Sequence, residues 1–414
     1  MKRPGTTRAW SVRTAHSGQD PGELTVGAAA VLRTARSRAV PEARIGGHIC
    51  LEEGPMKATV DRKALKHLLT QAKRTAGSTS LPVLTHVKLT SDGEETLQVD
   101  ASDIDLTYTA TLDASGGSAG SVLVPVKALH TLIGKLDGDE VTFSVEGDGR
   151  LAVTDAEAEL TLRTGALDDW PTFDGDPPGD GVTLSCDRLR AARSAVATDP
   201  DRPVLCAVLL DGGRGEAVAL DGYRIVRVVL DAEFAWSAQV PAGALGRILQ
   251  ARPGETLTVA YQHGSPGRVW FTTADGRQRW VAQTQTGRFP DYVSLWPDEI
   301  HATVTADAGR LRKAFERAHA FCAGQRNIAT LLVPGDGCVE VQVHSDTVGD
   351  TCERVPATLE GPVPQVALDP KFARDMVALL DGDVTIGMRD ALKPVVYTGS
   401  GHVSGLQMPM RVGS

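Results

Sequence analysis

Residues 124–145 read VPVKALHTLIGKLDGDEVTFSV, and this stretch decides the fold because its pattern returns twice further along the chain. An extended residue and a proline precede apolar residues at helical spacing, then glycine with an acidic residue, then alternating apolar residues. Proline favours the first turn of a helix, glycine permits the turn that ends it, and alternation indicates a half-buried strand. The pattern recurs as VPAGALGRILQARPGETLTV at 240–259 and as DPKFARDMVALLDGDVTI at 369–386.

The spacing of these copies predicts whole domains. The glycines after the three helices, Gly138, Gly254 and Gly382, are 116 and 128 residues apart. That period is too long for a solenoid repeat and fits an ordinary domain. Each unit also has an earlier stretch with helical periodicity, so the six predicted helices span 62–75, 126–136, 187–198, 242–252, 307–320 and 369–380. Short alternating strands fill the rest, which predicts an α+β unit with two helices on one side of antiparallel sheets.

Two similar connectors mark the domain boundaries. DWPTF at 169–173 and RFPDY at 288–292 each precede a polar or proline-rich break. The predicted domains are therefore 56–178, 179–299 and 300–414, which fits the length of 414 residues at roughly 100–200 residues per domain.

Residues 1–55 are predicted to lie outside the fold. They hold eight Lys/Arg against five Asp/Glu and show little apolar periodicity. Such a segment fits a disordered basic tail or a targeting peptide. A third interpretation is a mis-called start, because Glu52-Glu53-Gly54 before Met56 can be encoded by a purine-rich run resembling a ribosome-binding site. We favour a natural start at Met56, which the intact mass of the native protein would test.

Charge is distributed unevenly between helices and the rest of the chain. The net charge is −9, yet the predicted helices hold 18 Lys/Arg and 5 Asp/Glu, whereas the remaining residues hold 25 and 47. A solvated helix face can be basic by accident, but Glu forms helices as well as Lys or Arg does, so helix propensity does not explain its scarcity. Duplex DNA carries a negative charge about every 1.7 Å along its axis. Six basic helices therefore indicate a shared polyanion, held through its phosphates without reading bases.

The other function classes find little support. No apolar run approaches the roughly 20 residues of a membrane-spanning helix. The six cysteines include no C-x-x-C pair, which favours separate reduced thiols and no metal cluster. Two enzyme-like groups remain, the carboxylates Asp100, Asp103 and Asp105 and the pair His344 and Asp346. A strand would place Asp103 and Asp105 on one face and Asp100 on the other, so structural roles are favoured.

Six further motifs follow one another in a specific order: MKATV at 56–60, LPVL at 81–84, ASDIDL at 101–106, DGYR at 221–224, GRFPDY at 287–292 and MPMRV at 408–412. With these motifs the chain resembles the β subunit of bacterial DNA polymerase III, the sliding clamp, over nearly all of 56–412. The resemblance implies three clamp domains per chain and a head-to-tail homodimer that closes as a ring around duplex DNA, with helices lining the hole.

The resemblance also implies the partners. A clamp-loader complex opens and closes the ring, and the ring tethers the DNA polymerase III alpha subunit and other replication and repair proteins. The implied protein is a non-catalytic processivity factor of the cytoplasm, associated with the nucleoid, with no cofactor, no metal and no membrane contact. The DNA-facing residues would be Lys66, Lys73, Arg74, Lys127, Lys135, Arg188, Arg193, Arg247, Arg310, Lys313, Arg317, Lys371 and Arg374.

Partner peptides would bind in a groove between the second and third domains. The matching positions are Arg202, Leu205, Leu220, Gly222, Tyr223, Ile225, Pro290, Leu295, Met408, Pro409, Met410 and Arg411. Flexible methionines suit a site that accepts several apolar peptides. Without the resemblance, Met408 and Met410 are more readily interpreted as core residues.

The groove motif departs from the family's pattern. Leu220 and Tyr223 stand where Thr and His are usual, Ser294 stands where a basic residue is common, and Gly413 and Ser414 extend the end of the chain. Ser78 replaces a frequent DNA-contacting arginine. A divergent second copy of the clamp with altered partner binding therefore remains an alternative, as does a DNA-binding regulator. A regulator would present one or two base-reading helices rather than six equivalent ones.

Overall fold

A computed structural model describes residues 56–77, 81–145, 149–171, 176–179, 181–250, 252, 254–322, 330–345 and 348–411. The leader 1–55, Ser78, Asp346, Gly413 and Ser414 lie outside the described residues.

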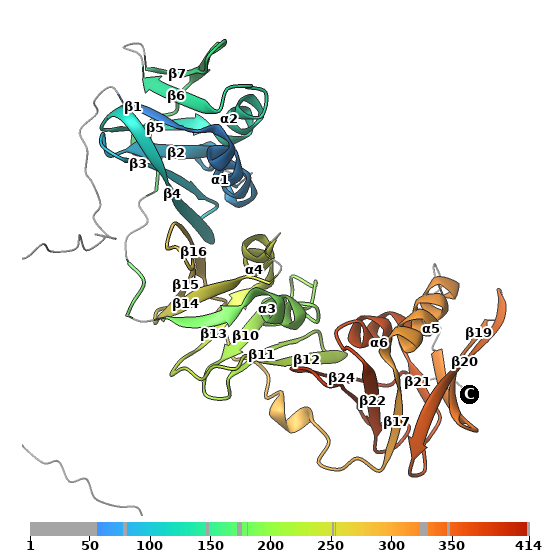
Figure 1. The fold of residues 1–414 in the computed structure, drawn as a ribbon. Helices are drawn as coiled ribbons and strands as arrows, with labels where there is room; N and C mark the ends of the chain where they lie inside the picture. Colours follow the sequence, from blue (N-terminus) through green and yellow to red (C-terminus); the bar gives the residue numbers. More distant parts are fainter. Residues whose placement is uncertain are drawn as a thin grey trace, which may run out of the picture. The chain divides into compact units, whose positions relative to one another are not determined.

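The described residues form six α-helices, which are α1 Arg62–Thr75, α2 Val126–Ile133, α3 Cys186–Arg193, α4 Ala242–Leu249, α5 Ala308–Phe321 and α6 Pro370–Val377. They pack in pairs, α1 with α2, α3 with α4 and α5 with α6 (Figure 1). Asp61 and Asp307 cap α1 and α5 by accepting the backbone N–H of the third residue that follows.

Four helices end earlier than their apolar spacing predicts. The helix predicted over 187–198 ends at Arg193, and those predicted to reach 136, 252 and 380 each end three residues sooner. Leu136 and Leu380 stay buried although the helix has already ended. A turn can therefore continue an apolar pattern that reads as helix.

The strands lie between these helices. The first third of the chain contains β1 Lys57–Asp61, β2 His86–Ser91, β3 Thr96–Ser102, β4 Leu106–Ser118, β5 Gly120–Pro125, β6 Glu140–Val145, β7 Arg150–Thr154 and β8 Glu159–Arg163. The middle contains β9 Val182–Ser185, β10 Ala207–Asp211, β11 Glu216–Leu220, β12 Arg224–Val229, β13 Ser237–Pro241, β14 Thr256–Gln262, β15 Arg268–Thr273 and β16 Gln278–Gln283. The last third contains β17 Ala302–Asp307, β18 Thr330–Gly335, β19 Cys338–Ser345, β20 Gly349–Glu360, β21 Val366–Leu368, β22 Asp383–Met388, β23 Val395–Thr398 and β24 Val403–Gln407.

Neighbouring thirds of the chain share sheets. Strand β4 of the first pairs antiparallel with β16 of the second, from Leu106 opposite Ala282 to Ala110 opposite Gln278. Strand β12 of the second pairs antiparallel with β24 of the third. The result is two sheets of 12 strands. One combines strands of the first and middle thirds of the chain, and the other combines strands of the middle and last thirds. The α+β class is confirmed.

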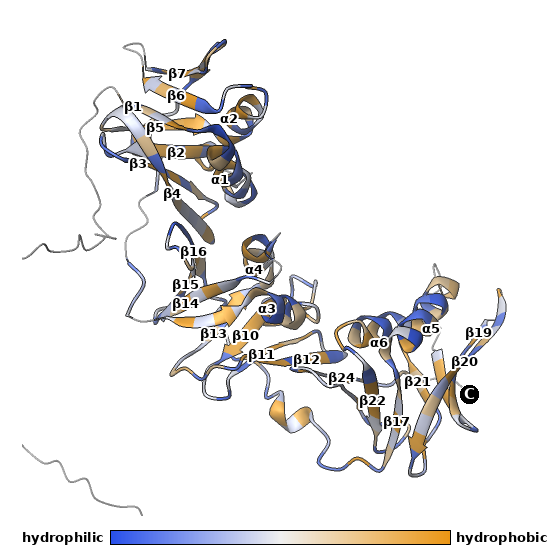
Figure 2. Ribbon diagram, viewed as in Figure 1, coloured by the Kyte–Doolittle hydropathy of each residue, from blue (hydrophilic) through white to orange (hydrophobic). Residues whose placement is uncertain are grey.

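Apolar faces of helices and strands form the core. Leu65 and Leu69 of α1 are fully buried and lie one turn apart, as an amphipathic helix requires. Trp270 and Trp280 are among the largest fully buried side chains. In Figure 2, α5 shows a long hydrophilic stretch in blue, while β22 is largely orange. No described helix is long and apolar enough to span a bilayer.

The enzyme-like groups do not come together. Asp103 and Asp105 lie in the turn between β3 and β4, so the expectation that both belong to a strand is wrong. Asp100 is buried and accepts hydrogen bonds from Gln98 and Thr109, each at 2.8 Å. His344 pairs with Asp350. Within the described ranges, no three His, Cys, Asp or Glu side chains gather closely enough to hold a metal ion.

Candidate functional site

An apolar cluster lies where β11, β12 and β24 meet. Its buried members are Val218, Leu220, Ile225, Tyr292 and Leu406, and partly buried neighbours pack against them, namely Leu205, Leu209, Phe289 and Trp296. The Tyr292 hydroxyl donates to the carboxylates of Asp211 and Glu216, both at 3.0 Å. Burial and the two carboxylates raise the pKa of Tyr292, so this hydroxyl keeps its proton. The cluster is therefore an apolar floor closed at one side by a neutral tyrosine.

The turn between β11 and β12 presents one exposed aromatic ring, that of Tyr223. Asp221 Oδ1 accepts the backbone N–H groups of Tyr223 and Arg224, both at 2.9 Å. Gly222 has φ +92°, which favours glycine. Tyr223 is consequently held 63 % exposed, with its ring centroid 6.2 Å from that of Phe372 on α6 and the ring planes 25° apart.

Residues 408–411, which follow β24, lie beside the Tyr223 turn. The backbone N–H of Met408 donates to Tyr223 O, and that of Met410 to Ala367 O, both at 2.8 Å. Met408 is 42 % exposed, so its interpretation as a core residue is wrong, while Met410 is half-buried. A methionine side chain thus faces solvent beside the exposed tyrosine.

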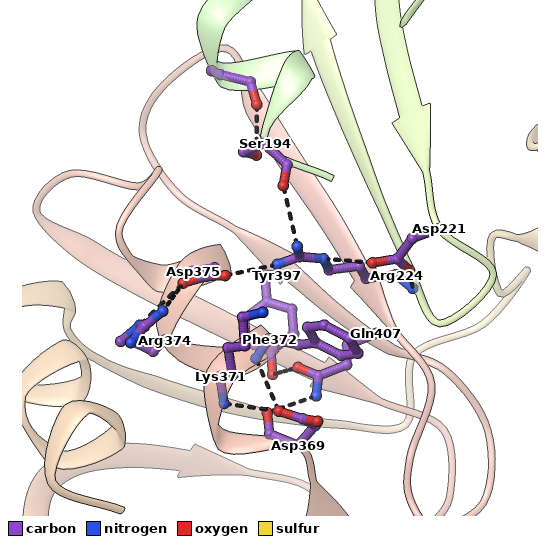
Figure 3. A network of polar contacts seen from close by, with 11 residues as sticks. Ser194, Asp221, Arg224, Asp369, Lys371, Phe372, Arg374, Asp375, Tyr397 and Gln407 are labelled. Atoms are coloured by element: carbon purple, nitrogen blue, oxygen red, sulfur yellow. Dashed lines mark hydrogen bonds and ion pairs between the residues drawn. The ribbon is translucent and has the colours of Figure 1, made fainter. Parts of the chain in front are cut away.

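Arg224 connects the turn before β12 to α6 and to the residue after α3 (Figure 3). Its Nε donates to Asp221 Oδ2 at 3.0 Å, its Nη1 to Asp375 Oδ2 at 3.1 Å and its Nη2 to Ser194 O at 3.1 Å. The guanidinium carbon also lies 4.5 Å from the centroid of the Phe372 ring. A single buried cation at the start of β12 therefore contacts the turn before that strand, α6 and the residue after α3.

A hydrogen-bonded chain below α6 fixes the start of that helix. Asp369 Oδ1 accepts from the backbone N–H groups of Lys371 and Phe372. Its backbone oxygen accepts from Gln407 Nε2 at 3.1 Å, and Gln407 Oε1 accepts from Tyr397 at 2.9 Å (Figure 3). Burial raises the pKa of Tyr397, so its hydroxyl keeps its proton and donates to Gln407.

The helices carry the second feature of interest. The six contain 16 Lys/Arg and 3 Asp/Glu within their observed bounds. Positive charges crowd where α1 meets α2, since burial and then Lys73 lower the pKa of Lys66, while burial, Lys66 and Lys73 lower that of His130.

Comparison with known proteins finds a similar family. Residues 56–174 match the family model described as DNA polymerase III beta subunit, N-terminal domain. The beta sliding clamp of Synechocystis is 25 % identical over 80 % of this chain and 93 % of its own.

Solved structures of sliding clamps share the fold. The clamp of Bacillus subtilis superimposes with a TM-score of 0.79 and 19 % identity, covering 87 % of this chain and all of its own. The clamp of Pseudomonas aeruginosa, bound to griselimycin, superimposes with a TM-score of 0.78 and 22 % identity, covering 87 % of this chain and all of its own. The predicted resemblance to the sliding clamp is confirmed.

Among the groove residues expected from the clamp resemblance, Leu205, Leu220 and Ile225 belong to the apolar floor. Tyr223, Met408, Leu295, Arg202 and Arg411 are exposed, whereas Pro290, Pro409 and Met410 are half-buried. A Cβ at Gly222, itself exposed, would lie 3.5 Å from Arg202 Nη1.

Sequence reasoning missed Phe372 and Arg224. Phe372 reads as one more residue of an apolar helix face, and Arg224 appears only as the last residue of the DGYR motif, outside the expected groove. That motif and the acidic Asp221 three residues before Arg224 were the available signals, because the two residues form an ion pair.

The expected DNA-facing cations fall into two groups. Lys73, Lys127, Lys135, Arg310, Lys313 and Lys371 are exposed. The others contact the protein itself, although the Arg317 side chain is also 65 % exposed: Lys66 with His130 O, Arg74 with Gln71, Arg188 with Asp231, Arg193 with Ala242 O, Arg247 with Asp103, Arg317 with Glu353 and Arg374 with Asp375. Arg193 lies flat on α4, because a Cβ at Gly246 would meet its guanidinium at 2.7 Å.

Proposed function

We propose that this chain is a DNA sliding clamp, a processivity factor that encircles duplex DNA and tethers the replicative polymerase. One observation carries the proposal: helices with 16 Lys/Arg and 3 Asp/Glu stand out from a chain whose net charge is −9. The clamp relatives support it, and they favour a clamp over a DNA-binding regulator or a divergent copy with another role.

The charge pattern suits sliding. Lysine and arginine contact phosphates without regard to sequence, and each contact exchanges readily with counterions. A closed ring needs no tight contact, because the topology itself prevents loss of the DNA. Acidic strands and loops outside the helices would discourage DNA from binding elsewhere.

The ring would be a head-to-tail homodimer. Open strand edges support this, since β8 pairs with β7 alone and Gly349–Pro356 of β20 pair with β19 alone in the part of the chain that the structure describes. A second copy can extend such edges by strand addition. We expect a mass of two chains in solution, and a strict monomer at micromolar concentration would contradict the ring.

The groove would receive peptides of the DNA polymerase III alpha subunit, the clamp-loader complex and other replication and repair proteins. An apolar floor with an exposed Tyr223 and Met408 fits a short peptide with hydrophobic anchors. Tyr223→Ala or Met410→Ala should weaken such a peptide about tenfold without changing the dimer mass. Competition against a fluorescein-labelled alpha-subunit peptide measures this.

The decisive experiment compares circular and linear DNA. We expect the protein, once placed on nicked circular DNA by the clamp loader, to remain bound in high salt and to leave after a restriction enzyme opens the circle. Equal retention on both forms would contradict a clamp. In this proposal the protein is non-catalytic, uses neither metal nor cofactor, and works in the cytoplasm at the nucleoid.

A further inference from the structure

An arginine holds each end of the β12–β24 pair. Arg224 stands at the start of β12, whereas Arg188 of α3 reaches the other end, where β12 stops and β24 begins. There Arg188 Nη1 donates to Val229 O at 2.9 Å, and the backbone N–H of Val229 donates to His402 O, also at 2.9 Å. His402 directly precedes β24, so this end of the pair joins the middle third of the chain to the last third.

The contact between Arg188 and His402 fixes the protonation of the imidazole. Arg188 Nη2 lies 2.7 Å from His402 Nε2. A guanidinium has N–H donors and no acceptor, so this hydrogen bond forms only when Nε2 carries no proton. The neutral imidazole then has its proton on Nδ1, which lies 3.8 Å from Asp231 Oδ1. In this arrangement His402 is neutral and accepts a hydrogen bond from an arginine.

Asp231 is the counterion of both groups. Its Oδ2 pairs with Arg188 Nη2, and its Oδ1 faces the imidazole. The hydrogen bond from Arg188 holds the pKa of Asp231 below its ordinary value, so this carboxylate stays charged in the range where histidine changes charge. Asp231 has φ +55°, a left-handed conformation that aspartate adopts more readily than most residues. Among the described residues, Arg188 of α3 and Asp231 beyond β12 are the charged groups found in contact with His402.

One added proton changes this arrangement. Histidine is the side chain that ordinarily changes charge between about pH 5 and 8. A proton from solvent on His402 Nε2 would set two N–H donors, both on cations, against each other. The imidazolium would instead turn to Asp231 and compete with Arg188 for the carboxylate. The three side chains would thereby change from no net charge to one positive charge.

We propose that Arg188, Asp231 and His402 form a proton-sensitive latch at the end of the β12–β24 pair. With His402 neutral, the latch holds the β23–β24 turn to α3 and keeps Arg188 occupied. With His402 protonated, the turn is released and Arg188 becomes available to an anion. This last step rests on the proposed function, in which Arg188 is one of the DNA-facing cations. The side chains of Asp231 and His402 are 57 % and 52 % exposed, so solvent reaches the site of the proton.

Two substitutions reproduce the two states at a single pH. His402→Gln is neutral and keeps an oxygen that can accept from Arg188, whereas His402→Lys is a permanent cation that cannot accept. His263→Lys is the matched control. His263 is also exposed, but it follows β14 and contacts the Tyr261 ring rather than Arg188. The control therefore adds the same charge outside the latch.

The first measurement does not involve DNA. In NMR spectra of the ¹⁵N-histidine-labelled protein at about pH 8, we expect the tautomer of His402 that is protonated on Nδ1. Hydrogen exchange at that pH should quicken about fivefold at the Val229 amide in His402→Lys and less than about twofold in His402→Gln and His263→Lys. A tautomer protonated on Nε2, or equal exchange in His402→Lys and His402→Gln, would overturn the latch.

The second measurement tests the release of Arg188. Anisotropy of a fluorescein-labelled duplex gives the affinity at several sodium chloride concentrations, at about pH 8 and about pH 5.5. Lowering the pH should steepen the plot of log affinity against log salt by roughly 0.9 more in the unaltered protein than in His402→Gln, the value for one added phosphate contact. At the higher pH, His402→Lys should give a steeper plot than His263→Lys.

The two measurements separate the latch from the proposed function. An equal change of slope in the unaltered protein and His402→Gln would overturn the release of Arg188. If none of the variants bound the duplex, the proposed function would be contradicted, and the tautomer and the exchange at Val229 would still decide whether the latch exists.

Discussion

Each of the two places where neighbouring thirds of the chain join has a pair of antiparallel strands and an arginine–aspartate ion pair, but the two arginines differ in burial. At the first, β4 pairs with β16 and Arg247 reaches Asp103 Oδ2 at 2.5 Å and Thr75 O at 3.4 Å. At the second, β12 pairs with β24 and Arg224 reaches Asp375. The Arg247 side chain is 29 % exposed, whereas that of Arg224 is 9 % exposed.

Burial decides what each junction can do. A pair whose arginine is 29 % exposed is partly screened by salt and contributes less, while a buried cation with several partners fixes geometry and is costly to disturb. The second junction lies beside the stacked rings of Tyr223 and Phe372, and the first carries one of the expected DNA-facing arginines. The difference predicts a rigid peptide site and a first junction that responds to salt and pH.

Removing Arg224 should have the largest effect. Arg224→Ala leaves Asp221 and Asp375 without their buried partner, and we expect a loss of about 3–5 kcal/mol in the free energy of unfolding. Chemical denaturation measures it. Adding Asp221→Asn should recover part of the loss, because the unpaired charge of the nearly buried Asp221 is then gone, whereas Asp375 keeps its pair with Arg374. A loss below about 1 kcal/mol would mean that the buried ion pairs of Arg224 stabilise the protein no more than an exposed pair does.

Arg247→Ala should cost less, about 1–2 kcal/mol, because water can solvate Asp103 once the pair is broken. The pair is also screened, so the difference between Arg247→Ala and the unaltered protein should shrink as sodium chloride rises. The corresponding difference for Arg224→Ala should stay nearly constant. Equal salt sensitivity at both sites would contradict the contrast in burial.

Asp100 makes the first junction sensitive to pH. It accepts from Thr109 of β4, which lies opposite Arg279 of β16. Burial raises the pKa of Asp100, against hydrogen bonds from Gln98 and Thr109 that lower it. Its penalty is absent below the unfolded-state pKa, near 3.9 for an ordinary aspartate, and grows as pH rises through the folded value.

Asp100→Asn should therefore gain melting temperature relative to the unaltered protein as pH rises from about 4 to 7. Thermal unfolding at several pH values checks this, with Asp113→Asn, an exposed residue of the same strand as Thr109, as the control. A difference that does not change with pH would show that the Asp100 charge carries no penalty.

Arg277→Ala should have the smallest effect. Arg277 forms two hydrogen bonds with Asp113 across the first junction, at 3.0 and 2.9 Å, but the side chains are 50 % and 80 % exposed. We expect a change within about 0.5 kcal/mol. A larger loss than that of Arg247→Ala would mean that geometry outweighs burial at this junction.

Much of the fold follows from local patterns. Apolar spacing places α1 and α5 to within one residue. The shorter helices were overextended, because the buried Leu136 and Leu380 continue the spacing past the last turn. Spacing records which residues are buried, and a buried residue can belong to a turn.

The site was predictable only in part. The apolar floor residues Leu205, Leu220 and Ile225 were expected from the resemblance and do pack together. Phe372 was not expected, because a residue on an amphipathic helix gives no sign of which partner element its ring will face. Asp375 and Arg224 are 151 residues apart, and no local rule pairs them.

The sequence by itself determined three repeated units, their alternation of helix and strand, and the concentration of positive charge on the helices. Each of these is set by the chemistry of residues close together in the chain. Tertiary structure alone decided that Arg224 and not Arg227 joins β12 to α6, and that Arg247 is bound to Asp103 while Lys127 is exposed. Packing made those choices, because the burial of a side chain and the charges around it depend on elements that are distant in sequence.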